Sequence, residues 1–123
     1  MVKNISPHVQ IYKFPVTAIS SIATRLSGLY LSGVFISTGL INLTNKDKYF
    51  IDKYNNLNNY FKKIINYSLI VPFNYHTLSG IRHFIWDKYP SYFLNNKNVA
   101  TSSYILFGST LFYSSLLEYY FLK

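Results

Sequence analysis

The stretch that decides the fold is residues 64–81, which read IINYSLIVPFNYHTLSGI and contain no Asp, Glu, Lys or Arg. Residues 26–45 and 98–117 share this property, and each of the three stretches holds 18 to 20 residues. About 20 residues of α-helix, rising ~1.5 Å each, cross a hydrocarbon core of about 30 Å. The pattern therefore predicts an all-α membrane protein with three transmembrane helices. We expect these helices at about residues 17–43, 60–86 and 99–120.

The rest of the chain fits one membrane domain, residues 1–123, which begins with an N-terminal segment at residues 1–16. Pro7 and Pro15 argue against a long helix in that segment. The residues between the expected helices, 45–59 and 87–98, are polar and predict loops. No second domain and no internal repeat is visible.

Basic residues account for the net charge of +8, with twelve Lys and Arg against four Asp and Glu. They mark the ends of the apolar stretches instead of forming one patch, which is their usual distribution around a bilayer. Membrane lipid is therefore the expected surrounding, and no nucleic acid is expected as a partner. Six Lys and Arg fall on each side of the expected spans, so the charges do not determine the orientation.

Composition also bears on redox chemistry and origin. The chain has no cysteine, which excludes a disulfide and a thiolate metal site. Residues 1–15 match neither a secretory signal nor an Arg- and Ser-rich transit peptide. The abundant Asn, Ile, Lys, Tyr and Phe have AT-rich codons, which suggests an organelle-encoded gene or an AT-rich bacterium.

His76 is the one histidine within the three charge-free stretches, and it shares a helix face with Gly80 and His83. A neutral imidazole is a strong iron ligand, and an ionisable residue inside a membrane favours a functional site. Gly80 leaves room for a macrocycle or a neighbouring helix, and Arg82 and His83 can neutralise haem propionates at the membrane edge. The alternative is a structural histidine that is hydrogen-bonded to another helix.

Ser21 and Arg25 are four residues apart, so they share one face of the first expected helix. A hydroxyl and a guanidinium on one face can hold a carbonyl-bearing ring. In the alternative, Ser21 bonds back to its own helix and Arg25 reaches the lipid headgroups.

A six-coordinate haem needs two axial ligands, and His76 supplies one at most. The other has to come from another polypeptide, unless the iron is five-coordinate, so the sequence favours a hetero-oligomeric helical bundle. Catalytic alternatives are poor. The four carboxylates all lie outside the middle of the expected spans, and no Ser-His-Asp set, phosphate loop or zinc spacing is present. We therefore expect a non-catalytic chain whose redox chemistry belongs to cofactors.

Three blocks of sequence resemble the cytochrome b membrane-anchor subunit of succinate dehydrogenase, which is respiratory complex II. Residues 6–12, SPHVQIY, resemble the family's SPHLxIY segment. Residues 14–28, FPVTAISSIATRLSG, resemble its S-I-x-H-R-x-[ST]-G motif with the residues that lead into it. Residues 76–87, HTLSGIRHFIWD, resemble its H-x-x-x-G-x-R-H-x-x-x-D motif. The order and spacing of the blocks agree with the family.

The resemblance implies roles for individual residues. His76 is implied as the axial ligand of haem b, with the second ligand from the small anchor subunit, and His83 as a neighbour of a propionate. Ser21 and Arg25 are implied to line the ubiquinone site. Phe14 and Ile22 would form the apolar wall of that site.

The resemblance also implies partners and a location. The partners are the small anchor subunit, the iron-sulfur subunit and the flavoprotein subunit. The location is the mitochondrial inner membrane or, alternatively, a bacterial inner membrane, with the N-terminus on the matrix or cytoplasmic side. Electrons from succinate would reach ubiquinone there.

One position departs from the family pattern, because Thr24 stands where the family has a histidine. A threonine carries no positive charge for a propionate. Two other functions remain open at this point. One is a purely structural membrane subunit, and the other is the same family working as a fumarate reductase.

Overall fold

The computed structural model describes residues 14–121, and the motif at residues 6–12 lies outside them. Within the described residues the chain is helical and contains no strand. Three helices are long and two are short. The long helices are α1 (Val16–Leu43), α3 (Asn59–Lys88) and α5 (Asn96–Phe121). The short helices are α2 (Asp47–Asn55) and α4 (Pro90–Phe93).

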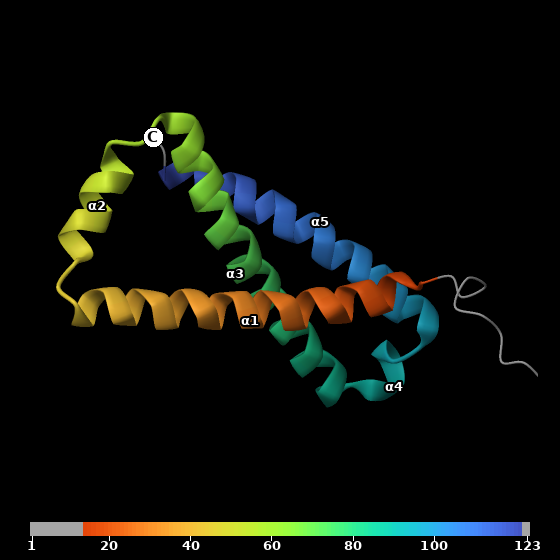
Figure 1. Cartoon of the computed structure of the whole chain (residues 1–123). Coiled ribbons are helices and arrows are strands. Elements are labelled where there is room, and N and C mark those ends of the chain that lie inside the picture. The colour runs from red at the N-terminus through yellow and green to blue at the C-terminus, as the bar shows by residue number, and fades with distance from the viewer. Residues whose placement is uncertain (1–13, 122–123) are drawn as a thin grey trace, which may run out of the picture.

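The three long helices pack against one another, with α1 crossing α3 and meeting α5 near its own N-terminal end (Figure 1). Helices α3 and α5 run antiparallel and side by side, and the N-terminal half of α1 packs against both. The C-terminal half of α1 diverges from the other two, so its residues 35–40 are all exposed. Helix α2 connects the diverging ends of α1 and α3 (Figure 1). The bundle is therefore tightest where the N-terminal turns of α1 meet α3 and α5.

The two segments expected as loops contain helices, so that expectation was wrong. In α2, Asp47 lies in the first turn and Lys53 in the last, which complements the helix dipole. Helix α4 begins with Pro90 at a first-turn position, where proline is well tolerated. Polar composition does not distinguish a loop from a short helix at a membrane surface, because both are rich in polar residues.

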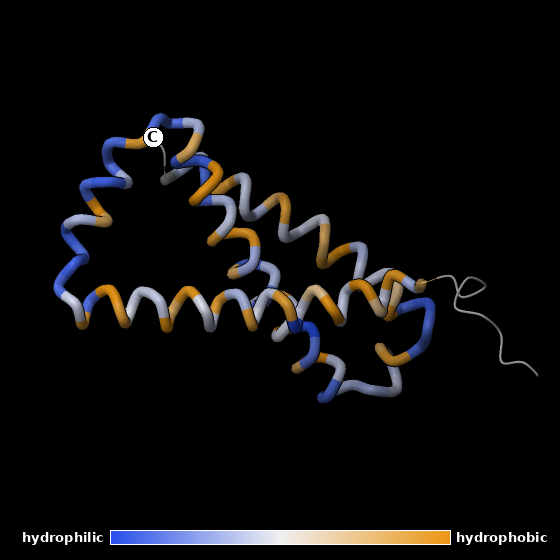
Figure 2. Tube along the Cα trace, in the orientation of Figure 1, coloured by the Kyte–Doolittle hydropathy of each residue, from blue (hydrophilic) through white to orange (hydrophobic). Residues whose placement is uncertain are grey.

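The interior of the bundle is polar and its exterior is apolar. Among the described residues, the buried apolar side chains are Tyr75 and Leu106, whereas seven polar side chains are buried. Large apolar side chains such as Leu29 (72% exposed) and Phe35 (70% exposed) point outward. Figure 2 shows hydrophobic positions recurring along α1, α3 and α5, whereas α2 is mostly hydrophilic. This distribution is the reverse of that in soluble proteins, and it fits helices that pack together inside lipid.

By length and apolar composition, α1 is the one described helix that clearly meets the requirement for crossing a membrane. It has 28 residues, which span about 42 Å at ~1.5 Å per residue. Helices α3 and α5 carry more polar residues, and several of these face the interior of the bundle. Together with the inverted burial, this makes the chain an all-α membrane protein.

Hydrogen bonds between side chains connect the long helices. The Asn74 side-chain amide on α3 donates to Ser114 Oγ on α5 over 3.1 Å. The Tyr30 hydroxyl on α1 donates to Ser68 Oγ on α3 over 3.4 Å. Contacts of this kind hold helices together where the apolar surroundings give no hydrophobic driving force.

Ser114→Ala is expected to destabilise the bundle by about 0.6 kcal/mol, the average for an interhelical hydrogen bond in a membrane protein. The measurement is the loss of helical circular dichroism of the purified chain in detergent as SDS is added. Ser115→Ala is the matched control, because Ser115 is exposed and its hydroxyl donates to Leu111 O within α5. Equal shifts for the two variants would show that the bond to Asn74 contributes nothing.

Candidate haem and quinone site

The His76 imidazole on α3 lies against the backbone of α1. Its Nδ1 atom is 3.2 Å from Thr24 O and 3.3 Å from Ser27 Oγ. A carbonyl oxygen only accepts, so Nδ1 must carry the proton of the bond to Thr24. Ser27 Oγ donates its own proton to Thr24 O over 2.9 Å and is free to accept from Nδ1. These contacts select the Nδ1–H tautomer and leave a lone pair on Nε2, the form in which histidine binds a metal.

Gly28 makes room for this imidazole. A Cβ atom at Gly28 would lie 2.8 Å from His76 Cε1 and 3.3 Å from its Nδ1. Real side chains do not approach so closely, so the ring rests on a surface that only glycine offers. In the sequence Gly28 is the last residue of the motif at residues 14–28, and nothing there indicates that it contacts the ring. The role of the Thr24 carbonyl was missed too, since a backbone atom has no sequence signature.

A haem fits this arrangement through the chemistry of its donor. His76 is exposed at the surface of the chain, with Nε2 as its unprotonated nitrogen. One turn later, a Cβ at Gly80 would meet no atom within 4 Å, so the same face stays open. His83 lies two turns along α3, about 10 Å away, too far to bind the opposite side of the same iron. Within residues 14–121 His76 could therefore supply one ligand to a haem iron, from an open face of α3.

The four residues expected at the quinone site lie at the N-terminal end of α1 or just before it. Ser21 is half-buried, and Arg25 is exposed. Ile22 is 43% exposed and Phe14 58% exposed. Within the described part of the chain, neither the Ser21 hydroxyl nor the Arg25 guanidinium forms a hydrogen bond with another residue. Because Arg25 directly follows Thr24, whose carbonyl contacts His76, the structure brings the two motifs 14–28 and 76–87 together.

Arg82 has contacts that differ from the propionate role expected of it. Its Nη1 donates to Ser103 Oγ on α5 over 3.0 Å, and its Nη2 donates to Ser20 Oγ on α1 over 2.8 Å. Its guanidinium carbon lies 4.4 Å from the centroid of the Trp86 ring, a cation–π distance. Arg82 thus points into the bundle and connects the three long helices.

His83, the next residue, points to the surface. Its ring meets the Trp86 ring edge-on, with centroids 5.3 Å apart. It borders an open cavity of about 310 Å³ that also includes Asp87 and Leu94. Successive helical residues are rotated by about 100°, which explains why Arg82 and His83 face different surroundings.

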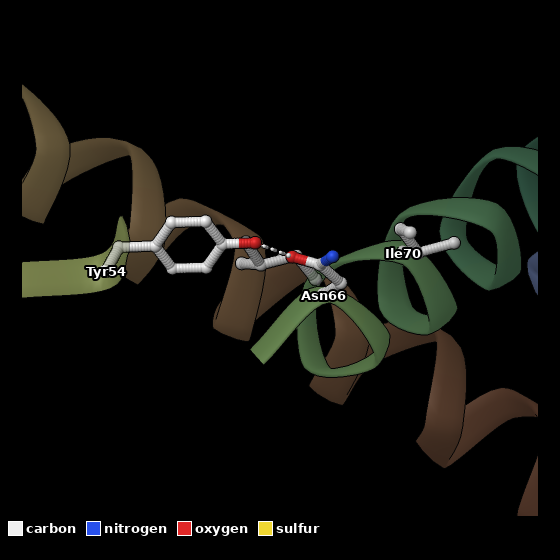
Figure 3. A pocket seen from close by; sticks show the side chains of 4 residues that line it. Tyr54, Asn66 and Ile70 are labelled. Atoms are coloured by element: carbon white, nitrogen blue, oxygen red, sulfur yellow. Dashed lines mark hydrogen bonds between the residues drawn. The ribbon is translucent and has the colours of Figure 1, made fainter. Parts of the chain in front are cut away.

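Two other cavities offer less chemistry. One, of about 270 Å³, lies between α2 and α3, where the Tyr54 hydroxyl donates to Asn66 Oδ1 over 2.9 Å (Figure 3). The second, of about 470 Å³, is an apolar groove among the three long helices. Neither is lined by a histidine, a carboxylate or a basic residue. The face of His76 and the adjacent turns of α1, where the two motifs meet, are the candidate site.

Comparison with known proteins gives a family and several relatives. Residues 1–117 match the model of the succinate dehydrogenase/fumarate reductase transmembrane subunit family. A succinate dehydrogenase cytochrome b560 subunit of Marchantia polymorpha is 32% identical over 91% of this chain and 85% of its own length. The subunit of the same name from Reclinomonas americana is 32% identical over 85% of this chain and 76% of its own length. A mitochondrial cytochrome b560 subunit of Dictyostelium discoideum is 34% identical over 68% of this chain and 44% of its own length.

Proposed function

We propose a function that proceeds from one established premise: this chain belongs to the succinate dehydrogenase/fumarate reductase transmembrane subunit family. It is a membrane anchor of complex II. It crosses the membrane three times through α1, α3 and α5. Together with the small anchor subunit it holds the iron-sulfur and flavoprotein subunits on the mitochondrial inner membrane. The mitochondrial location is supported by the names of two relatives, from Dictyostelium discoideum and Mus musculus.

His76 would supply an iron ligand to a haem b that is shared with the small anchor subunit. The Nδ1–H tautomer, held by Thr24 and Ser27, directs the Nε2 lone pair away from α1. The open face around Gly80 leaves space for a flat macrocycle. Besides His76, Arg25 and His83 are the exposed basic residues within the two motifs, and we assign them to the propionates. When bound, the haem supplies a one-electron redox centre.

Ser21 and Arg25 bind the ubiquinone head group. The Ser21 hydroxyl donates to a quinone carbonyl, and the Arg25 charge stabilises the oxygen as it becomes anionic during reduction. The apolar side chains of Phe14 and Ile22 border the ring. The observation that carries this proposal is the contact between His76 and Thr24, since it brings both family motifs to one face of the bundle.

Succinate oxidation is favoured over fumarate reduction as the direction of the reaction. The family description includes both activities, but the five relatives are all named as succinate dehydrogenase subunits. The chain itself supplies binding and orientation and is not the catalytic subunit.

Arg25→Ala and Ser21→Ala test the quinone role in the purified complex. Removing a hydrogen bond to a charged or partly charged group costs about 1.5–3 kcal/mol, so we expect succinate–ubiquinone reductase activity to fall by about 10- to 100-fold. Succinate oxidation with a water-soluble dye should persist, because it does not require the membrane site.

Ser37→Ala is the control for these variants, since the Ser37 hydroxyl is exposed and donates only to Gly33 O within α1. Full quinone reductase activity in Arg25→Ala would remove the quinone role and favour a purely structural subunit.

A further inference from the structure

We infer that Arg82 is a positioning residue for the quinone site and acts through Ser20. This inference deepens the proposed function and rests on it. It differs from the propionate role expected from sequence, because the Arg82 side chain acts through contacts inside the bundle and not through a contact with the haem.

The argument begins with the polar cluster around Ser20, which is 0% exposed. Arg82 Nη2 donates to Ser20 Oγ over 2.8 Å. The Tyr75 hydroxyl lies 3.0 Å from Ser20 O and 3.2 Å from Ser20 Oγ. Tyr75 and Arg82 are two turns apart on one face of α3, so they approach the same serine from opposite directions along the helix axis. The two contacts therefore hold Ser20 at one position along α3 and hold α1 against α3 at that point.

Arg82 is built to hold a fixed geometry. Its guanidinium lies over the Trp86 ring and reaches a serine on each neighbouring helix, Ser20 on α1 and Ser103 on α5. A guanidinium presents its donors in a rigid fork, whereas a lysine ammonium is a single point on a flexible chain. Within residues 14–121 Arg82 has no carboxylate partner, so hydroxyl groups and the Trp86 ring are what stabilise the cation inside the bundle. Moving either serine would leave a cation poorly compensated in an apolar setting.

Ser20 transmits this geometry to the proposed site. It directly precedes Ser21, so any rotation of this turn re-aims the Ser21 hydroxyl. Thr24 Oγ1 also donates to Ser20 O over 3.0 Å, and the Thr24 carbonyl holds His76. A shift at Ser20 therefore moves Ser21 and Thr24 together. Arg82 forms no hydrogen bond with Ser21, Arg25 or His76, so its effect on them is indirect.

A matched pair of variants, Ser20→Ala and Ser103→Ala, tests the inference in the assembled complex. Both serines are 0% exposed, and each accepts one bond from Arg82. Only Ser20 belongs to the helix that carries the proposed quinone ligands. We expect Ser20→Ala and Arg82→Gln to raise the KM for ubiquinone about tenfold, since small misplacements of positioned groups have effects of this order. Ser103→Ala should leave the KM for ubiquinone nearly unchanged. It should nevertheless lower the thermal stability of the complex about as much as Ser20→Ala does.

The double variant Ser20→Ala with Arg82→Gln should raise the KM no further than Arg82→Gln alone, because both act through one bond. Equal changes in KM for Ser20→Ala and Ser103→Ala, or independent effects in the double variant, would overturn the inference. A shift of haem midpoint potential in Arg82→Gln without any in Ser20→Ala would overturn it in favour of a propionate contact. If Arg82→Gln does not assemble, the serine pair still decides.

The proposed function is tested separately by Ser21→Ala and Arg25→Ala. If those two variants lower quinone reductase activity and Ser20→Ala leaves the KM unchanged, the positioning role alone fails. If Ser21→Ala and Arg25→Ala have no effect, the quinone site itself is wrong.

Discussion

His76→Ala is expected to remove the b-type haem spectrum from the assembled complex completely. His76 Nε2 is the nitrogen that the contacts to Thr24 and Ser27 leave without a proton, and alanine has no donor to replace it. His83 lies about 10 Å along α3, so it cannot move into the vacated position without unwinding the helix. The measurement is the reduced-minus-oxidised absorbance difference of the purified complex, with haem extracted and quantified in parallel.

His83→Ala is the comparison for this result. His83 contacts Trp86 at the surface and is assigned to a propionate and not to the iron, so its removal should lower haem retention modestly and keep the spectrum. An unchanged haem spectrum in His76→Ala would show that the iron is held by other chains. His76 would then be a structural histidine that holds α3 against α1.

Gly28→Ala is expected to lower haem affinity by about 10- to 100-fold, the usual effect of disturbing the residues that orient a metal ligand. The added Cβ would lie 2.8 Å from His76 Cε1, so the imidazole has to move away from α1 and lose its contact with Thr24 O. The helix itself should tolerate the change, because alanine is favoured over glycine within a helix by up to about 1 kcal/mol. The variant thus separates ligand orientation from folding.

Gly33→Ala is the matched control for Gly28→Ala. It makes the same substitution in the same helix, but the new Cβ would meet no atom within 4 Å. The haem-to-protein ratio and the haem midpoint potential should match the wild type in Gly33→Ala and fall or shift in Gly28→Ala. Full haem content in both variants would mean that the imidazole of the assembled complex does not rest on Gly28.

The sequence was sufficient to predict where the long helices lie along the chain. It was insufficient to predict how each helix is rotated about its own axis. Charge-free stretches mark the helices because charged side chains are excluded from hydrocarbon, and the observed helices of residues 16–43, 59–88 and 96–121 can be compared with the expected 17–43, 60–86 and 99–120. Apolar residues occur on every face of each of these helices, so hydrophobic periodicity does not reveal which face points into the bundle. This is why Ser20 and Ser21, adjacent and identical, could not be distinguished from sequence, although Ser20 is fully buried and Ser21 only half-buried.

The same limit applies to charged groups near the helix ends. The sequence places Glu118, like the other three carboxylates, outside the middle of the expected spans. The structure leaves it only 4% exposed, and within residues 14–121 neither of its carboxylate oxygens has a hydrogen-bond partner. Arg82 was expected at the membrane edge, whereas the structure directs it inward to Ser20 and Ser103. For both residues the sequence shows the charge of the side chain, whereas the rotation of the helix about its axis determines which groups surround that side chain.

The hydroxyl-lined interior of the bundle has a thermodynamic consequence. Heat capacity rises when a protein unfolds in water because apolar groups become hydrated. Here the apolar side chains already face outward, so separating the helices within lipid hydrates few of them. We therefore expect the enthalpy and the entropy of that separation to change little with temperature, unlike those of a water-soluble domain that unfolds and exposes an apolar core.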